Sequence, residues 1–232
     1  MNWQNVRVIL TGGSSGIGAC LLKLLKEKKA NVVFGGHIEF EVKQQSELTG
    51  YKGIVADLSK EEELVCFFET AINHLGGVDV LINNAGFVIA ESFEDLSRAH
   101  FEYMFAINTI APARLSQLVL PFFRKNKQGD ILNIGATGAY YAFEKGAAYS
   151  ASKSALQIVS QNLCLEYRKE NIRVFHIDPS WCTDTNNNNY GTPIPQDAER
   201  LNPSDITESI IHVLEMNRRA FVPQMKIFGT KL

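Results

Sequence analysis

Short apolar runs alternate along the chain with longer segments in which apolar residues recur at helical spacing. Such runs are typical of strands buried on both faces, as in a parallel sheet that helices cover on each side. We predict strands at 6–10, 31–34, 53–57, 78–82, 130–134 and 172–177, and the start of a seventh at 220–222. We predict helices at 17–25 and at about 97–126, 148–169 and 203–216. Ser59 and Glu62 fit a capping box, which predicts that a further helix starts there. The alternation predicts an α/β fold with a doubly wound parallel sheet.

One polar segment interrupts this pattern near the C-terminal end. Residues 184–202 contain a run of asparagines at 186–189, with prolines and a glycine, and are too polar to pack as a core element. We expect a mobile loop there that covers a substrate. No linker or change in composition divides the chain, so residues 1–232 are expected to form a single domain.

Composition and charge exclude several classes of partner. The chain is 45% hydrophobic and 21% charged, which is ordinary for a globular protein. Its 23 Lys and Arg nearly balance its 25 Asp and Glu without a basic block, so no nucleic acid partner is expected. No apolar run reaches the roughly 18 residues of a membrane span, and no signal peptide is evident, so we expect a cytoplasmic protein without membrane attachment. The four cysteines lack metal-binding spacing, and no metal site is expected.

A glycine-rich segment, TGGSSGIG at 11–18, joins the first predicted strand to the first helix. Glycines let the backbone turn sharply and approach a pyrophosphate closely. The helix N-terminus adds N–H groups and the positive end of its dipole. The segment therefore predicts a phosphate-binding loop, which by itself names no reaction.

Two further groups of residues belong to the same predicted site. Residues 83–86 follow the fourth strand, so they lie on the same carboxyl edge of the sheet as the glycine loop. Tyr149 and Lys153 begin a predicted helix at a spacing that puts both side chains on one face. An ammonium beside a phenol favours the phenolate, so we expect a lowered pKa for Tyr149, which would make it usable as a general acid and base. By itself this spacing is more typical of a surface pair and does not establish a site.

Taken together, these segments resemble the short-chain dehydrogenase/reductase family. Residues 11–18, 83–86, Asn108, Tyr149 and Lys153 occur in the order and approximate spacing of that family, and the resemblance covers essentially the whole chain. It implies a Rossmann-type fold that binds NAD(P)(H). It also implies hydride transfer between the nicotinamide and a carbonyl or secondary alcohol of a small molecule.

The resemblance implies roles for individual residues. It makes Tyr149 the catalytic acid and base, Lys153 the residue that holds the nicotinamide ribose, and Asn108 the holder of a proton-relay water. The residues implied to contact the cofactor are Gly12, Ser14, Ser15, Gly16, Ile17, Gly18, His37, Asp57, Leu58, Asn84, Ala85, Gly86, Tyr149, Lys153 and Pro179. The family pattern further implies a homodimer or homotetramer, with helices around 101–123 and 149–167 at the interface.

The sequence departs from the family where the catalytic serine is expected. That serine normally lies thirteen residues before the tyrosine, at the position of Ala136 in this chain. Thr137 is its neighbour, but adjacent residues on a strand point to opposite faces, so we expect Thr137 to be turned away. It could replace the serine only if the strand has already ended or bulges at this point. Ser180 stands where the family has glycine. We expect Ala136, Thr137 and Trp181 to lie on the substrate side of the site.

The end of the second strand bears on cofactor choice. An acidic residue there would hold the adenosine ribose hydroxyls and favour NAD, whereas this chain has Gly36 and His37. Nothing at Gly36 would repel a 2′-phosphate, and a partly protonated His37 could bind one. The sequence therefore favours NADP(H) over NAD(H), although Ser15 occupies the other common basic position.

Two other interpretations stay open. Ala136 and Ser180 also fit a catalytically weak protein of the same fold that senses the cofactor or holds a ligand. The third interpretation is a structural or interaction protein with no cofactor, which the complete glycine loop opposes.

Overall fold

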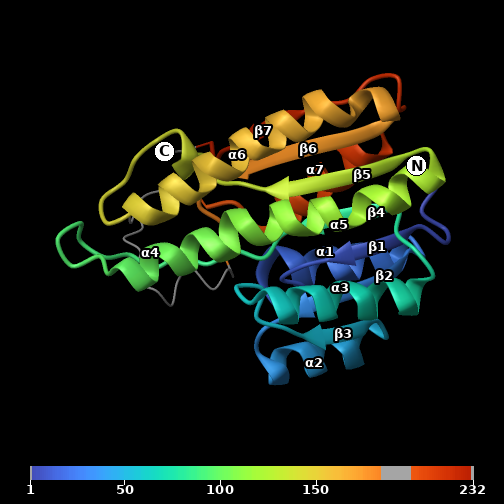
Figure 1. Ribbon diagram of the computed structural model, residues 1–232, viewed down its shortest axis with the longest axis horizontal. Helices are drawn as coiled ribbons and strands as arrows, with labels where there is room; N and C mark the ends of the chain where they lie inside the picture. The colour runs from blue at the N-terminus through green and yellow to red at the C-terminus, as the bar shows by residue number, and fades with distance from the viewer. Residues whose placement is uncertain (1, 184–199, 231–232) are drawn as a thin grey trace.

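Seven parallel strands form one sheet among the residues that the computed structural model describes, 2–183 and 200–230 (Figure 1). They are β1 (Arg7–Leu10), β2 (Asn31–Gly36), β3 (Lys52–Val55), β4 (Val80–Asn83), β5 (Gly129–Ile134), β6 (Ile172–Pro179) and β7 (Gln224–Ile227). Their order across the sheet is β3-β2-β1-β4-β5-β6-β7. The chain builds the sheet outward from β1 to β3 and then in the opposite direction from β4 to β7. This confirms the predicted doubly wound α/β fold.

Helices cover both faces of the sheet (Figure 1). One face carries α1 (Gly16–Glu27) and α7 (Pro203–Glu215), and the other carries α3 (Glu61–Leu75), α5 (Ala111–Asn126) and α6 (Ala147–Tyr167). Helix α2 (Glu39–Thr49) packs beside β2 and β3, and α4 (Arg98–Phe105) packs on α6. A π-helical turn, Ala106–Ile110, separates α4 from α5, so the helix predicted at 97–126 is divided.

Each face of the sheet has its own hydrophobic cluster because successive strand side chains point to opposite faces. Leu10 and Phe34 pack beneath α1 and α7, whereas Ile9 and Val33 pack beneath α3 and α5. Phe123 of α5 is completely buried in the second cluster. The two clusters fix the sheet between its helices and hold its carboxyl edge as a rigid platform.

Two elements differ from the sequence prediction. The seventh strand is Gln224–Ile227 and not 220–222, where the Ala220 amide instead closes a turn on the Asn217 carbonyl. Helix α2 was not predicted because its amphipathic pattern is weak, with only Val42 and Thr49 buried among its residues.

The predicted capping box at Ser59 and Glu62 is wrong. Helix α3 begins at Glu61, and its N-cap residue Lys60 makes no side-chain capping bond. The Ser59 hydroxyl donates to the Asp57 carboxylate at 2.7 Å instead. A capping box is present at the start of α7, between Asn202 and Asp205.

Most of the predicted substrate loop, residues 184–199, lies outside the described residues. Its last part is described. The Leu201 amide donates to the Trp181 carbonyl, the Thr183 amide donates to the Leu201 carbonyl, and Leu201 is buried. Within the described residues, no helix is both long and apolar enough to cross a bilayer.

Candidate active site

A cleft of about 810 Å³ opens along the carboxyl ends of β1, β2, β4, β5 and β6. It brings together residues that are far apart in the chain, because parallel strands deliver their following loops to one edge. The predicted site residues that line it are Gly12, Ser14, Ser15, Gly16, Ile17, His37, Asp57, Leu58, Asn84, Ala85, Gly86, Ala136, Thr137, Tyr149, Lys153, Pro179 and Trp181. Gly18 and Asn108 do not line it.

The glycine loop is held tightly against the segment that follows β4. Gly12 has a φ of +65°, and a Cβ there would lie 2.8 Å from the Ala85 Cα. At Gly18, a Cβ would collide with the Gly12 carbonyl, so Gly18 serves the packing of the loop and not the surface of the cleft. The Asn84 amide donates to the Gly12 carbonyl at 2.7 Å, which ties the two segments together.

Helix α1 starts at this loop and presents its N-terminus to the cleft. Its N-cap residue, Ser15, makes no side-chain capping bond. The first turn of a helix leaves N–H groups without intrahelical partners, and they carry the positive end of the helix dipole. Since Ser15, Gly16 and Ile17 all line the cleft, this terminus is built to receive an anion.

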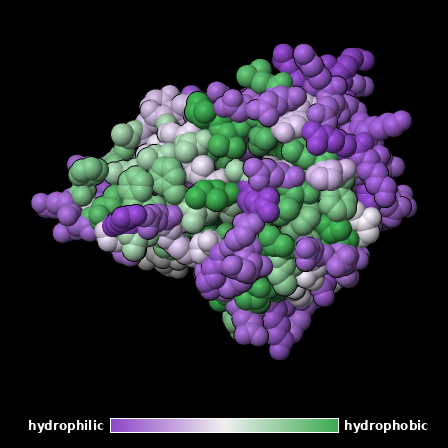
Figure 2. All heavy atoms as spheres, viewed as in Figure 1, coloured by the Kyte–Doolittle hydropathy of each residue, from purple (hydrophilic) through white to green (hydrophobic). Residues whose placement is uncertain are grey.

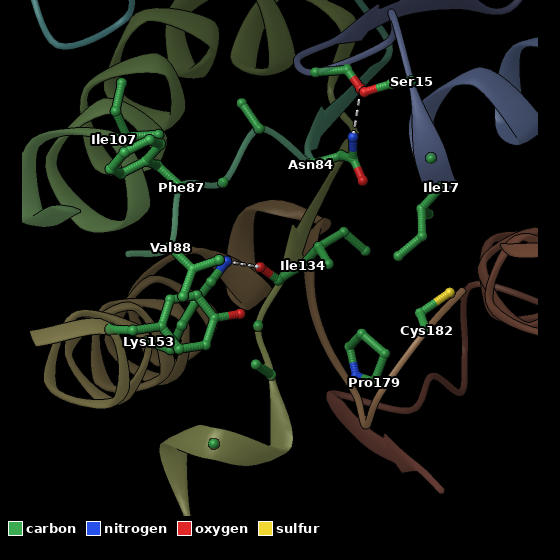
Figure 3. A pocket seen from close by; sticks show the side chains of 18 of the residues that line it. Ser15, Ile17, Asn84, Phe87, Val88, Ile107, Ile134, Lys153, Pro179 and Cys182 are labelled. Carbon is green, nitrogen blue, oxygen red and sulfur yellow. Dashed lines mark hydrogen bonds between the residues drawn. The ribbon is translucent and has the colours of Figure 1, made fainter. Parts of the chain in front are cut away.

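Tyr149 and Lys153 come from the first two turns of α6 and face the same cleft. The Lys153 side chain is buried, and its ammonium donates to the Ile134 carbonyl at 2.8 Å (Figure 3). The same ammonium lies 5.9 Å from the centre of the Tyr149 ring. Among the described residues, the Tyr149 hydroxyl makes no hydrogen bond, so it is available to a molecule in the cleft.

The expected lowering of the Tyr149 pKa is not what the protein alone produces. Burial raises the pKa of Tyr149 above its ordinary value, and the negative charge of Asp178 raises it further. Burial also lowers the pKa of Lys153 to about 8, although Asp178 opposes this shift. The prediction counted the attraction of the ammonium and left out the cost of burying both charges. Tyr149 therefore keeps its proton throughout the neutral range.

Asn108 supports the site from behind. It is completely buried in the π-helical turn, where its amide donates to the Phe87 carbonyl at 2.8 Å and to the Ser152 hydroxyl at 2.9 Å. Its side-chain oxygen accepts from the Phe87 amide at 2.8 Å. Ser152 directly precedes Lys153, so these bonds fix the start of α6 against the loop after β4.

Thr137 is not turned away as the sequence analysis expected. Strand β5 ends at Ile134, Ala136 is extended, and Thr137 begins a short 3-10 turn, Thr137–Ala139. The alternation of a strand no longer applies beyond Ile134, and both Ala136 and Thr137 line the cleft. In the described structure, the Thr137 hydroxyl makes no hydrogen bond.

Asp178, which the sequence analysis did not select, anchors this part of the site. It is completely buried at the end of β6, and its carboxylate accepts from the Ala136 amide at 3.1 Å and the Tyr140 hydroxyl at 2.9 Å. The His176 ring lies 2.9 Å from the same carboxylate. In the sequence, the one feature that could have pointed to Asp178 is its position directly before Pro179, a predicted site residue.

Aromatic rings dominate the end of the cleft beyond Tyr149. The Phe143 ring meets Tyr149 at 6.2 Å and Trp181 at 5.9 Å between ring centres, in both cases edge to face. Tyr141 and Phe228 form a similar pair at 6.1 Å. All five line the cleft, and Phe143 and Phe228 had no distinguishing motif in the sequence.

Comparison with known proteins decides the family. The family profile described as short chain dehydrogenase matches residues 6–197.

The chain belongs to the short-chain dehydrogenase family.

A curated relative of this short-chain dehydrogenase is an uncharacterized oxidoreductase of Staphylococcus aureus (strain MRSA252). It is 26% identical over 222 residues, which cover 94% of this chain and 95% of that protein.

Solved structures share its architecture. A serine dehydrogenase complexed with NADP+ gives a TM-score of 0.88 at 20% identity, covering 96% of this chain and 94% of that one. A 3-ketoacyl-(acyl-carrier-protein) reductase from Brucella melitensis complexed with NADH gives a TM-score of 0.88 at 22% identity, covering 98% of both chains. At these identities the likeness shows the fold, which is the predicted Rossmann-type fold.

No group of His, Cys, Asp and Glu side chains suited to a metal ion occurs within residues 2–183 and 200–230 of this short-chain dehydrogenase. Lys153 and Asp57 are the cleft's only Lys, Arg, Asp or Glu residues among those described.

Proposed function

We propose that this short-chain dehydrogenase transfers a hydride between a nicotinamide dinucleotide and a carbonyl or secondary alcohol group of a small molecule. The observation that supports this best is the placement of Tyr149 and Lys153 in the cleft that also holds the glycine loop. The oxidoreductase relative and the solved neighbours, which were determined with NADP+ or NADH, point the same way.

The residues present fit such a cofactor. The uncapped N-terminus of α1 suits a pyrophosphate, and the glycine loop lets backbone atoms approach it. Gly86 leaves the way to Lys153 clear, since a Cβ there would lie 3.4 Å from the ammonium. In this proposal Lys153 holds the ribose beside the nicotinamide, and Pro179 forms the opposite wall of the cleft. The bound dinucleotide supplies the hydride acceptor or donor.

Tyr149 acts on the reacting oxygen in this proposal. Because its pKa is raised, it is protonated at neutral pH and can donate that proton to the oxygen of a carbonyl as the oxygen gains negative charge. In the oxidising direction the phenolate is required, which burial disfavours. The protein therefore favours reduction near neutral pH and oxidation at higher pH.

A catalytically weak relative that senses cofactor is the second candidate, and Ala136 is the observation that favours it. A hydroxyl donor to the developing oxyanion is absent at this position, and losing one such donor costs about 10²–10³ in rate in other enzymes. The Thr137 hydroxyl lies beside it in the cleft and is the available replacement.

Turnover separates the two candidates. Oxidation of NADPH or NADH is followed by absorbance with a panel of ketones and aldehydes, beside a direct measurement of cofactor binding. Binding with turnover that depends on Tyr149 supports the enzyme. Binding without turnover on any substrate supports the sensor, and absence of binding refutes both.

We further propose that the chain assembles as a homodimer or homotetramer through α4, α5 and α6. Figure 2 shows several hydrophobic areas on this face, with hydrophilic residues between and around them. The exposed apolar side chains there include Phe101, Ile110, Ile158 and Leu165, of which Leu165 is 62% exposed.

Three expectations from the sequence stay predictions. They are that residues 1–232 form one domain, that residues 184–202 cover the substrate, and that the protein is cytoplasmic.

A further inference from the structure

The end of β2 is closed to the acidic side chain that would favour NAD. A Cβ at Gly36 would lie 2.7 Å from the Val42 side chain and 2.9 Å from the Ser14 hydroxyl oxygen. In the sequence, the bare Gly36 indicates that nothing at this position would repel a 2′-phosphate. The structure shows that this position is glycine for reasons of packing, so the absence of a carboxylate there says little about the cofactor.

A carboxylate reaches the same place from a different element. Glu41 lies in the first turn of α2, and the Ser14 hydroxyl donates to its Oε2 at 3.0 Å. Ser14 is buried and lines the cleft between the glycine loop and Gly36. Helix α2 thus brings a negative charge to the edge of the cleft just past the end of β2, where the adenosine ribose of a dinucleotide lies in this fold.

The bond to Glu41 determines what Ser14 can offer a ligand. A serine hydroxyl has a single proton, and a carboxylate is a strong acceptor for it. With that proton directed to Glu41, the Ser14 oxygen presents only lone pairs to the cleft. Lone pairs match the hydroxyl of a ribose, which can donate. They do not match a 2′-phosphate, whose oxygens are acceptors.

The other charges at this end do not compensate for Glu41. Asp57 adds a second carboxylate, which the Ser59 amide holds in place. The Lys60 ammonium pairs with Asp57 at 3.7 Å, and among the described residues it forms no ion pair with Glu41. Among the described residues lining this end there is no arginine or lysine. His37 is exposed and lies near Asp57, whose pKa it helps to lower.

We propose that Glu41, acting through Ser14, determines cofactor choice and favours NAD(H) over NADP(H). The proposal rests on the proposed function, since it assumes that the cleft binds a nicotinamide dinucleotide. It reverses the preference that the sequence alone favours, because the discriminating carboxylate comes from a helix that the sequence did not predict. Glu41 accepts the Ser14 proton, leaves an acceptor for the ribose hydroxyl and repels a 2′-phosphate.

Binding measurements on the whole protein test this without any substrate. Dissociation constants of NADH and NADPH are measured for the wild type, for Glu41→Gln and for the control Glu39→Gln. Glu39 lies in the same first turn and carries the same charge, but it is exposed and makes no bond to Ser14. We expect the wild type to bind NADH more tightly. Glu41→Gln should shift the affinity ratio about tenfold toward NADPH, from the charge removed close to the phosphate, while Glu39→Gln leaves it within about twofold.

The outcomes distinguish a failure of the proposed function from a failure of the role given to Glu41. If the wild type binds neither dinucleotide, the proposed function fails. If it binds them but Glu41→Gln leaves the ratio unchanged, or if Glu39→Gln shifts it equally, the role of Glu41 is refuted. Ser14→Ala serves as a second variant should Glu41→Gln fail to fold. It should weaken NADH more than NADPH, and an equal loss for both would overturn the proposed route through Ser14.

Discussion

Replacing Lys153 by methionine should change how the stability of the cofactor-free protein depends on pH. The Lys153 ammonium is buried and donates to a single backbone carbonyl, that of Ile134. Among the described residues, no ion pair accompanies it. Methionine keeps much of the apolar stem and removes the charge, so the comparison isolates the cost of holding an ammonium ready beside the cleft.

The magnitude follows from the pKa of Lys153. Burial lowers that pKa from 10.5 to about 8. At 1.36 kcal/mol per pKa unit, keeping the group charged in the folded state costs about 3 kcal/mol at neutral pH. Between the two pKa values the folded state binds fewer protons than the unfolded state, so wild-type stability rises with pH in that window. The cost is fully present below the folded pKa and disappears above the unfolded one.

Urea unfolding at pH 7 and pH 10 measures the effect. The free energy of unfolding of Lys153→Met relative to wild type should fall by about 2.5 kcal/mol between these pH values. Loss of the bond to Ile134 affects both pH values alike and cancels from this change. Lys23→Met, which removes an exposed lysine of α1, should show no comparable change. If the difference in unfolding free energy between Lys153→Met and wild type is the same at pH 7 and pH 10, burial does not lower the pKa of Lys153 and the reasoning is refuted.

Three further outcomes follow from the site and its surface. Tyr149→Phe should abolish turnover and leave the cofactor dissociation constant within about twofold, because the phenol acts on the reacting oxygen; near-full activity on a verified substrate would remove Tyr149 from the mechanism. Thr137→Ala should lower kcat about 10²-fold if the Thr137 hydroxyl replaces the missing donor. If instead Ala136→Ser raises kcat about tenfold and Thr137→Ala leaves it unchanged, no side chain replaces that donor. Ile110→Glu together with Leu165→Glu should yield monomers in sedimentation equilibrium, and an unchanged oligomer would place the interface elsewhere.

Much of the fold could be predicted because its signals are local. The six strands from 6–10 to 172–177 are short apolar runs, and all six are present in the structure. Five of them are buried beneath helices as expected, whereas β3 lies at the edge of the sheet and is only partly buried, with Val55 49% exposed. Helix α2 lacked such a signal, since only Val42 and Thr49 of its residues are buried. An apolar stripe along a helix is visible in the sequence, whereas a helix such as α2, which is held by one buried apolar side chain, that of Val42, and by the Ser46 hydroxyl that accepts from the Gly53 amide, is not.

The site was predictable where a motif fixes the backbone and less so where packing decides. Gly12 could be placed from the strand end that it follows, whereas Tyr149 was placed in the site by the resemblance of the combined motifs to the family. The direction of Thr137 could not, because it depends on β5 ending at Ile134, and no residue type marks that boundary. The pKa of Tyr149 was misjudged since burial and the charge of Asp178 are properties of the folded chain.

Gly12 and Gly36 illustrate why the same residue type can support opposite inferences. Gly12 is required by its backbone, with a φ of +65° that other residues rarely adopt. Gly36 has no such φ, and it is glycine because Val42 and Ser14 fill the space a side chain would need. An aspartate at Gly36 would therefore disturb the wall of the cleft as well as adding a charge, and it cannot report on cofactor choice. The charge that can be changed without disturbing that wall is Glu41, which approaches from outside it and contacts the cleft through a single hydroxyl.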